Sequence, residues 1–228
     1  FERIFRLYSS KGWDHVIGIL HEQGRMHNDI QEVVNNNIYN QELVCLHPQQ
    51  QTLPLTHFTH QDDNHLFTER LIYIPASASL DETYLKTNHE EAEIVIDLIA
   101  SWQRVLEANE LRWTIGVITP FRAQIAAILH KAHTCNINMH NVTVDTVERY
   151  QGGAKDIVIM SCAVNNHQTL SRIVSLNAEG IDRKLNVAVT RARQQFILVG
   201  NESILMKETA YSALVRMSKR IVYHSSPA

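Results

Sequence analysis

From residue 71 onward, short apolar runs alternate with longer segments whose apolar residues recur at helical spacing. The runs occupy 71–74, 113–118, 142–144, 157–162, 196–199 and 221–223, and the helical segments occupy 88–108, 120–133, 181–193 and 203–217. Strands that alternate with helices of this length require crossover connections, which produce a parallel sheet covered on both faces. Continuous apolar runs are typical of strands buried on both sides. We therefore predict a three-layer α/β domain with a mainly parallel central sheet.

The first 70 residues are less regular. Helical patterns occur over 1–8 and again through Val33, Val34 and Ile38, whereas 46–70 is rich in His, Gln, Thr and Asp. Long structureless segments are uncommon within compact domains, so 46–70 is interpreted as a loop or insertion within a single domain, 1–228. Residue 1 already falls within a helical pattern, and we expect the native chain to begin earlier.

Charge and cysteine usage limit the possible environments. The net charge of −3 provides no overall basic field, so a nucleic-acid function would need a local cluster of Lys and Arg. The three cysteines, Cys45, Cys135 and Cys162, are far apart and fit a reducing compartment. No apolar run approaches the roughly 20 residues that span a bilayer. A cytoplasmic or nucleoid-associated protein without a membrane partner is expected.

In parallel α/β sheets, ligands bind beyond the carboxyl ends of the strands. This rule predicts functional loops directly after residues 118, 145, 162 and 200, together with the helix starts near them. Thr119 followed by Pro120 is typical of a helix N-cap, and free backbone donors at a helix start bind phosphate. Thr119 and Arg122 are therefore candidate contacts to a nucleic-acid strand, with simple helix capping as the alternative.

Four segments carry a resemblance to a known family. They are, in chain order, Gln23–His27, Ile115–Gln124, Val144–Asp156 and Leu185–Arg193. Together they resemble ordered motifs of superfamily 1 helicases, in the group that includes the nonsense-mediated-decay helicase and the replication helicase-nuclease family. The sequence has no Gly-x-x-x-x-Gly-Lys-[Ser/Thr] P-loop. The resemblance thus implies the second, C-terminal RecA-like domain, whose partner is an N-terminal RecA-like domain of the same chain that carries the P-loop.

The resemblance implies that Arg25 and Arg191 are catalytic arginine fingers that contact the γ-phosphate of ATP. A guanidinium remains charged and offers planar donors to a transferring phosphoryl group. Arg191 and Arg193 are predicted at the end of a helix and, being two residues apart, point in different directions, so that one can reach an inter-domain cleft while the other braces the domain. The alternatives are a solvated helix terminus for Arg191 and a surface residue at a helix start for Arg25.

The remaining site residues also follow from the resemblance. Nucleotide contacts are expected from Gln23, Gly24, Gly152 and Ala154, and contacts to nucleic acid from Thr119, Arg122, Thr143, Asp145 and Gln151. Gly24 stands where the family has a nucleotide-stacking Tyr, and Ala154 stands where it often has a ribose-binding Glu. Other motif residues are read as structural: Met26 and His27 as packing and capping groups, Lys155–Asp156 as an ion pair, and Asn88 and Glu91.

These expectations describe half of an ATP-dependent motor. The cofactor would be ATP with Mg²⁺, the metal being held mainly by the N-terminal domain, and no metal site is expected in this chain. The partner would be single-stranded nucleic acid, DNA favoured over RNA, and the isolated chain would be inactive. The alternative is a non-catalytic nucleic-acid-binding or partner-docking module with a degenerate RecA fold, which Gly24 and Ala154 favour.

Overall fold

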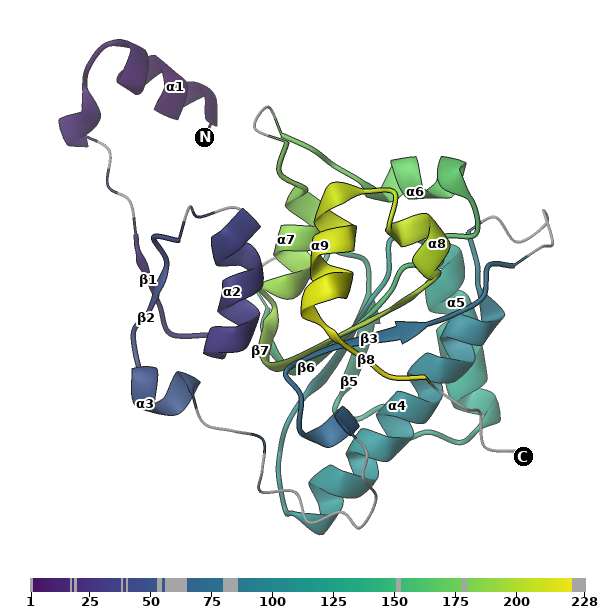
Figure 1. Ribbon diagram of the computed structural model, residues 1–228. Coiled ribbons are helices and arrows are strands. Elements are labelled where there is room, and N and C mark those ends of the chain that lie inside the picture. The colour runs from purple at the N-terminus through teal and green to yellow at the C-terminus, as the bar shows by residue number, and fades with distance from the viewer. Residues whose placement is uncertain are drawn as a thin grey trace.

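The computed structural model describes residues 2–16, 18, 20–37, 39, 41–52, 55, 65–79, 86–150, 153–177 and 180–222. Its centre is a six-stranded sheet with the strand order β5-β4-β6-β7-β3-β8, in which every neighbouring pair is parallel (Figure 1). The strands are β3 (Leu71–Pro75), β4 (Ile115–Ile118), β5 (Val142–Asp145), β6 (Lys155–Ser161), β7 (Ala192–Gly200) and β8 (Lys219–Arg220). The predicted parallel sheet is confirmed.

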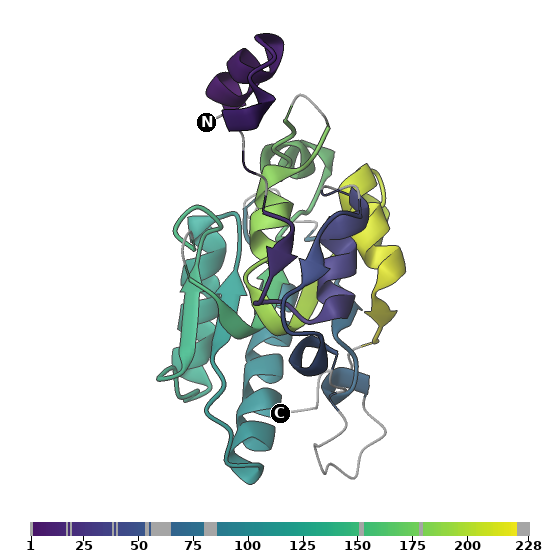
Figure 2. The same cartoon turned by 90° about the vertical axis from the view of Figure 1, so that its left-hand side faces the viewer.

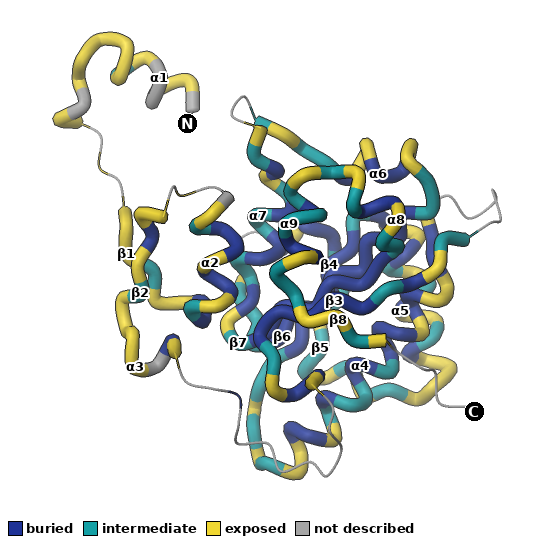
Figure 3. Tube along the Cα trace, in the orientation of Figure 1, coloured by how far each residue is buried: buried dark blue, intermediate teal, exposed yellow. Residues whose placement is uncertain are grey.

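Helices cover both faces of the sheet, which gives three layers (Figures 1 and 2). One face packs against α4 (His89–Ala108) and α5 (Arg122–Thr134), and the other against α2 (Asn28–Asn37), α6 (His167–Ile173), α7 (Arg183–Val189), α8 (Glu202–Leu205) and α9 (Thr209–Met217). Side chains alternate along β6, so that Ile157 and Ile159 face α4 whereas Val158 and Met160 face α7. The central strands β3, β4, β6 and β7 are accordingly the most deeply buried of the sheet, whereas β5 and β8 at its edges are more exposed (Figure 3).

Several predicted helix boundaries are wrong. The N-cap of α5 is Phe121, and neither Thr119 nor Pro120 begins the helix. The helix expected over 181–193 ends at Val189, because backbone pairing of Arg191 with β6 takes the chain into β7. The segment 203–217 is two helices, the last strand lies at 219–220, and α6 was not anticipated.

The segment before β3 is made mostly of short elements, and α2, Leu66 and Phe67 within it are part of the same hydrophobic core as the sheet. The segment also contains α1 (Glu2–Ser10), a 3-10 turn at Asp14–Val16, the two-stranded parallel sheet of β1 (Glu22–Gln23) and β2 (Val44–Cys45), α3 (Pro48–Gln51) and a 3-10 turn at His65–Phe67. The predicted loop over 46–70 therefore includes two short helical turns among its described residues. None of the helices that the structure describes is long and apolar enough to cross a membrane.

Candidate functional site

Arg25 lies in a tight turn between β1 and α2. The side-chain Oε1 of Gln23 accepts hydrogen bonds from the backbone N–H of Arg25 at 2.8 Å and of Met26 at 2.7 Å. The Gln23 amide thus shapes the turn and leaves the Arg25 side chain exposed. From there Nη1 of Arg25 donates to the backbone oxygen of Thr190 at 3.2 Å. This bond joins Arg25 to the last of the four predicted motifs, 185–193, although the two bonded residues are 165 positions apart in sequence.

Arg191 follows directly on Thr190 and is held by two backbone carbonyls. Its Nε donates to Val187 at 3.3 Å, and its Nη1 donates to Gly153 at 3.2 Å. Partial burial and, second, the charge of Arg25 lower the pKa of Arg191. Among the described residues, the hydrogen bonds of both guanidiniums go to backbone carbonyl oxygens. Neither guanidinium forms an ion pair with a carboxylate of a described residue.

This arrangement places two positive side chains together at one spot. Like charges in proximity repel, and the repulsion is relieved when an anion binds between them. Guanidiniums also present paired donors that match phosphate oxygens. The residues present therefore fit the phosphate end of a nucleotide. Within the described ranges no cluster of three His, Cys, Asp or Glu side chains could hold a metal ion.

The two arginines lie at the amino edge of the sheet. Arg191 immediately precedes β7, and its carbonyl partner Gly153 precedes β6. These two candidate residues thus lie at the opposite edge of the sheet from the loops expected after the carboxyl ends of the strands, and that expectation stays a prediction. Ala154 lies at the same edge and is half-buried, and Gly24 is exposed in the Arg25 turn. The predicted site residues Gln151 and Gly152 lie outside the described residues.

The pairing predicted for Lys155 and Asp156 is wrong. Asp156 Oδ2 accepts hydrogen bonds from the backbone and hydroxyl of Thr114, both at 2.8 Å, and its other oxygen lies 3.5 Å from Nη1 of Arg193. Arg193 is thereby a bracing residue on β7, not a residue at a helix end. Lys155 points elsewhere, with Nζ donating to Oγ1 of Thr143 at 2.9 Å.

Thr143 lies on β5 with its side chain exposed. Lys155 contacts its hydroxyl, and Tyr150 Oη donates to its backbone oxygen at 2.6 Å. Both side chains cross Gly116 on the neighbouring strand, where a Cβ would lie 2.8 Å from Lys155 Cγ and 2.9 Å from Tyr150 Oη. The sequence alone did not predict that Lys155 and Tyr150 lie beside Thr143. The lysine adds a positive charge beside this candidate strand contact.

The other predicted strand contacts meet at the carboxyl edge of β4 and β5. The backbone N–H of Thr119 donates to the backbone oxygen of Asp145 at 3.2 Å. Arg122 is exposed at the start of α5, and Asp145 lies 3.6 Å from Nε of Arg149. Thr119 is fully buried, so its side chain is not presented to solvent. Arg122 and Arg149 are both exposed cations at this edge.

A buried polar network supports this edge from below. Asn88 caps α4 by accepting from the N–H of Glu91, and Gln124 Nε2 donates to Oγ of Ser161. Ser161 Oγ and the N–H of Ala163 in turn donate to Oε2 of Glu91, at 2.7 and 2.8 Å. Burial raises the pKa of the Glu91 carboxyl to about 8. Asn88 and Glu91 thus have the packing environment expected of structural residues.

Met26 and His27 have the packing and capping positions predicted for them. Met26 is buried in the core, and Nδ1 of His27 accepts a hydrogen bond from the N–H of Asp29 at the start of α2.

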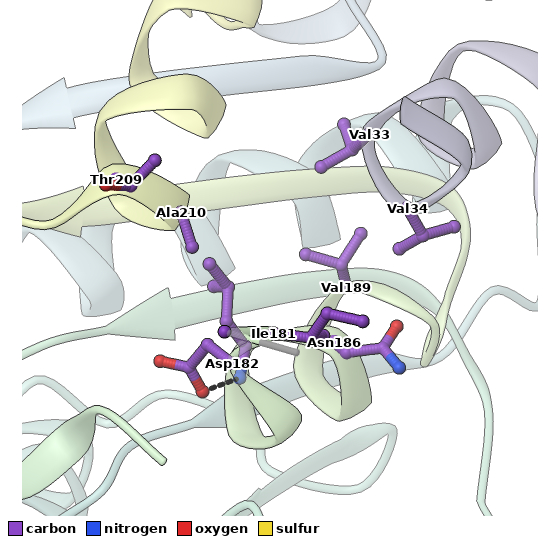
Figure 4. A pocket seen from close by; sticks show the side chains of 10 residues that line it. Val33, Val34, Ile181, Asp182, Asn186, Val189, Thr209 and Ala210 are labelled. Carbon is purple, nitrogen blue, oxygen red and sulfur yellow. Dashed lines mark hydrogen bonds between the residues drawn. The ribbon is translucent and has the colours of Figure 1, made fainter. Parts of the chain in front are cut away.

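A cavity of about 140 Å³ lies between α2, α7 and α9 (Figure 4). Apolar side chains such as Val33, Val34 and Val189 form much of its lining, and none of the predicted site residues lines it.

Comparison with known proteins assigns the chain to a family. A family model described as an AAA domain matches residues 1–203. The chain belongs to this family. Its fold is the RecA-like α/β architecture of superfamily 1 helicases, in agreement with the four ordered motifs.

Three relatives illustrate the match. A DNA polymerase alpha-associated DNA helicase A from Saccharomyces cerevisiae is 27% identical over 217 residues, which cover 91% of this chain and 30% of that protein. A regulator of nonsense transcripts 1 from Dictyostelium discoideum is 29% identical over 206 residues, 85% of this chain and 14% of that protein. An uncharacterised ATP-dependent helicase from Methanocaldococcus jannaschii is 25% identical over 230 residues, 97% and 31% respectively. The chain therefore spans a third or less of each relative.

Proposed function

We propose that this chain is the second motor domain of an ATP-dependent nucleic-acid helicase. The observation that carries the proposal is the proximity of the Arg25 and Arg191 side chains. Arg25 bonds to the backbone oxygen of Thr190, the residue before Arg191, and both guanidiniums bond to carbonyl oxygens. ATP and its Mg²⁺ would be held on the P-loop of an N-terminal RecA-like domain of the same protein. Arg25 and Arg191 would then approach the γ-phosphate when the two domains close.

The chemistry of the two arginines suits a phosphoryl-transfer step. Negative charge develops on the transferring group, and fixed guanidinium donors stabilise that charge without reorganising. The carbonyls of Val187 and Gly153 hold the Arg191 side chain in place while its remaining N–H donors stay available. ATP supplies the free energy for movement along a strand, and the residues of this chain orient and neutralise the phosphate.

The strand would lie against the carboxyl edge of β4 and β5 and the Thr143–Lys155 pair. Backbone phosphates would contact Arg122, Thr143 and Lys155, and Asp145 and Thr119 would shape the surface around them. The strand contact expected from Gln151 stays a prediction. The relatives' names include both a DNA helicase and a regulator of transcripts, so they do not favour either nucleic acid. The expected preference for DNA remains a prediction.

A split ATP site makes a direct prediction for the chain by itself. The purified 228-residue chain should hydrolyse no ATP above the buffer rate, with or without single-stranded nucleic acid, because it has no P-loop. Joined to its P-loop domain, it should hydrolyse ATP, and single strands should accelerate the reaction. Hydrolysis by the chain alone would refute the proposal.

The alternative is a nucleic-acid-binding module that does not use ATP. The observations that favour it are Gly24, exposed where the family has Tyr, and Ala154, where it often has Glu. The same experiment separates the two functions. If this chain, joined to its P-loop domain, binds single strands but shows no strand-stimulated ATP turnover, the result would support the module and contradict the motor.

A further inference from the structure

The turn that carries Arg25 is hydrogen-bonded to a side chain that lies 25 residues later in the sequence than Met26. Gln51, the last residue of α3, is buried, and its Nε2 donates to the backbone oxygens of Gln23 at 3.1 Å and Met26 at 2.6 Å. Its Oε1 accepts from the backbone N–H of His47 at 2.8 Å. The side-chain amide therefore uses both of its ends, and its donors join the two ends of the turn that contains Arg25.

The local structure around Gln51 serves this contact. A four-residue helix is far below the length that is stable alone, so α3 depends on its tertiary contacts. Pro48 is the first residue of α3, and the backbone N–H of Gln51 donates to the backbone oxygen of His47 at 3.0 Å. The pairing of β1 with β2 brings the chain back beneath the turn, with Leu46 N–H donating to the Gln23 oxygen at 2.9 Å. The segment 44–51 is thus a brace for the turn.

We propose that Gln51 is a positioning residue for Arg25, because its amide fixes the turn from which the guanidinium reaches Thr190 and lies beside Arg191. The inference rests on the proposed function, since it matters only where Arg25 acts on ATP. Without the Gln51 amide, the Gln23 side chain still bonds within the turn, so the turn forms. Its ends are no longer tied to α3, and Arg25 samples positions away from Arg191. A misplacement of about 1 Å at a catalytic group costs up to about a hundredfold in rate.

The test measures ATP turnover and strand binding by the full-length protein, this chain together with its P-loop domain. Gln51→Ala should lower kcat by about tenfold or more, with the KM for ATP and the Kd for single strands within about twofold. Gln51→Glu keeps the acceptor for His47 but removes both donors, and it should lose at least as much. Gln49→Ala is the matched control, because Gln49 is an exposed glutamine on the same turn of α3.

A double-variant experiment distinguishes positioning from a general structural role. In an Arg25→Ala background, Gln51→Ala should change kcat by less than about twofold, because contacts that act through one residue are not additive. A full additional loss there would overturn the proposal. So would an unchanged kcat for Gln51→Ala when Arg25→Ala alone lowers kcat, and this result would leave the motor function intact. No loss in Arg25→Ala itself would instead refute the arginine assignment, and with it this inference.

Folding is checked by thermal unfolding followed by circular dichroism. Gln51→Met provides a second variant of similar volume without donors. If both Gln51→Ala and Gln51→Met fail to fold, Gln51 stabilises the whole domain and the positioning role is refuted. If either folds with reduced kcat and unchanged strand binding, the positioning role is supported.

Discussion

Glu91 is a fully buried carboxyl whose ionisation should control stability between pH 5 and 8. Its Oε2 accepts from Ser161 and Ala163, whereas its Oε1 is buried with no hydrogen-bond partner among the described residues. Burial is the largest cause that raises its pKa to about 8, from an ordinary value of 4.5. The folded chain thus favours the neutral acid, which is the form that Gln imitates in shape and charge.

The sign and size of the effect follow from this difference in pKa. Because the folded-state pKa is raised, the stabilising contribution is complete below pH 4.5, decreases as the pH rises, and is absent above about pH 8. Each pH unit corresponds to about 1.4 kcal/mol, so a difference of about 3.5 units corresponds to a loss of up to about 5 kcal/mol in the free energy of unfolding. Glu91→Gln removes this dependence.

Urea unfolding of the 228-residue chain from pH 5 to 8.5 measures the effect. We expect Glu91→Gln to match the wild type within about 1 kcal/mol at pH 5 and to exceed it by several kcal/mol at pH 8. The control is Glu93→Gln, since Glu93 is an exposed carboxylate on the same helix that pairs with Lys131. If the difference between Glu91→Gln and the wild type stays constant over this pH range, the reasoning about Glu91 is refuted.

Two further predictions concern the surface around Thr143. Lys155→Ala should weaken binding to single strands of any sequence and reduce the salt dependence of binding by about one charge, measured by fluorescence anisotropy at several salt concentrations. Lys131→Ala, at a surface ion pair on α5, is the control, and an equal effect of both variants would contradict the role of Lys155. Gly116→Ala should lower the free energy of unfolding by about 1–3 kcal/mol, because its Cβ would meet Lys155 and Tyr150. Unchanged stability in urea unfolding would show that both side chains move aside freely.

The sheet is the part of the fold that local sequence determines most directly. Runs such as 157–160 are apolar at every position, and the structure places them in strands covered on both faces. The helix ends were harder to predict because they depend on tertiary pairing. Arg191 and Arg193 continue a helical pattern, yet the backbone bond from Lys155 to Arg191 takes this segment into β7.

The candidate site was only partly predictable for the same reason. Motif resemblance identified Arg25 and Arg191, but nothing in their sequence surroundings shows that the carbonyls of Thr190 and Gly153 hold them. Gln51 belongs to a polar segment without periodicity, and its role depends on a contact with a turn 25 residues earlier. Such contacts depend on how the chain returns in space, which periodicity and spacing do not specify.

ATP turnover by the full-length protein carrying Arg191→Ala is the most direct test of the central claim. An arginine that stabilises the transferring phosphoryl group contributes about 10³ to 10⁵ in rate, so kcat should fall by about that factor while the Kd for single strands stays within about twofold. Arg216→Ala, an exposed arginine on α9, should leave both unchanged. Wild-type turnover in Arg191→Ala would contradict the assignment of this chain as the arginine-bearing side of an ATP site.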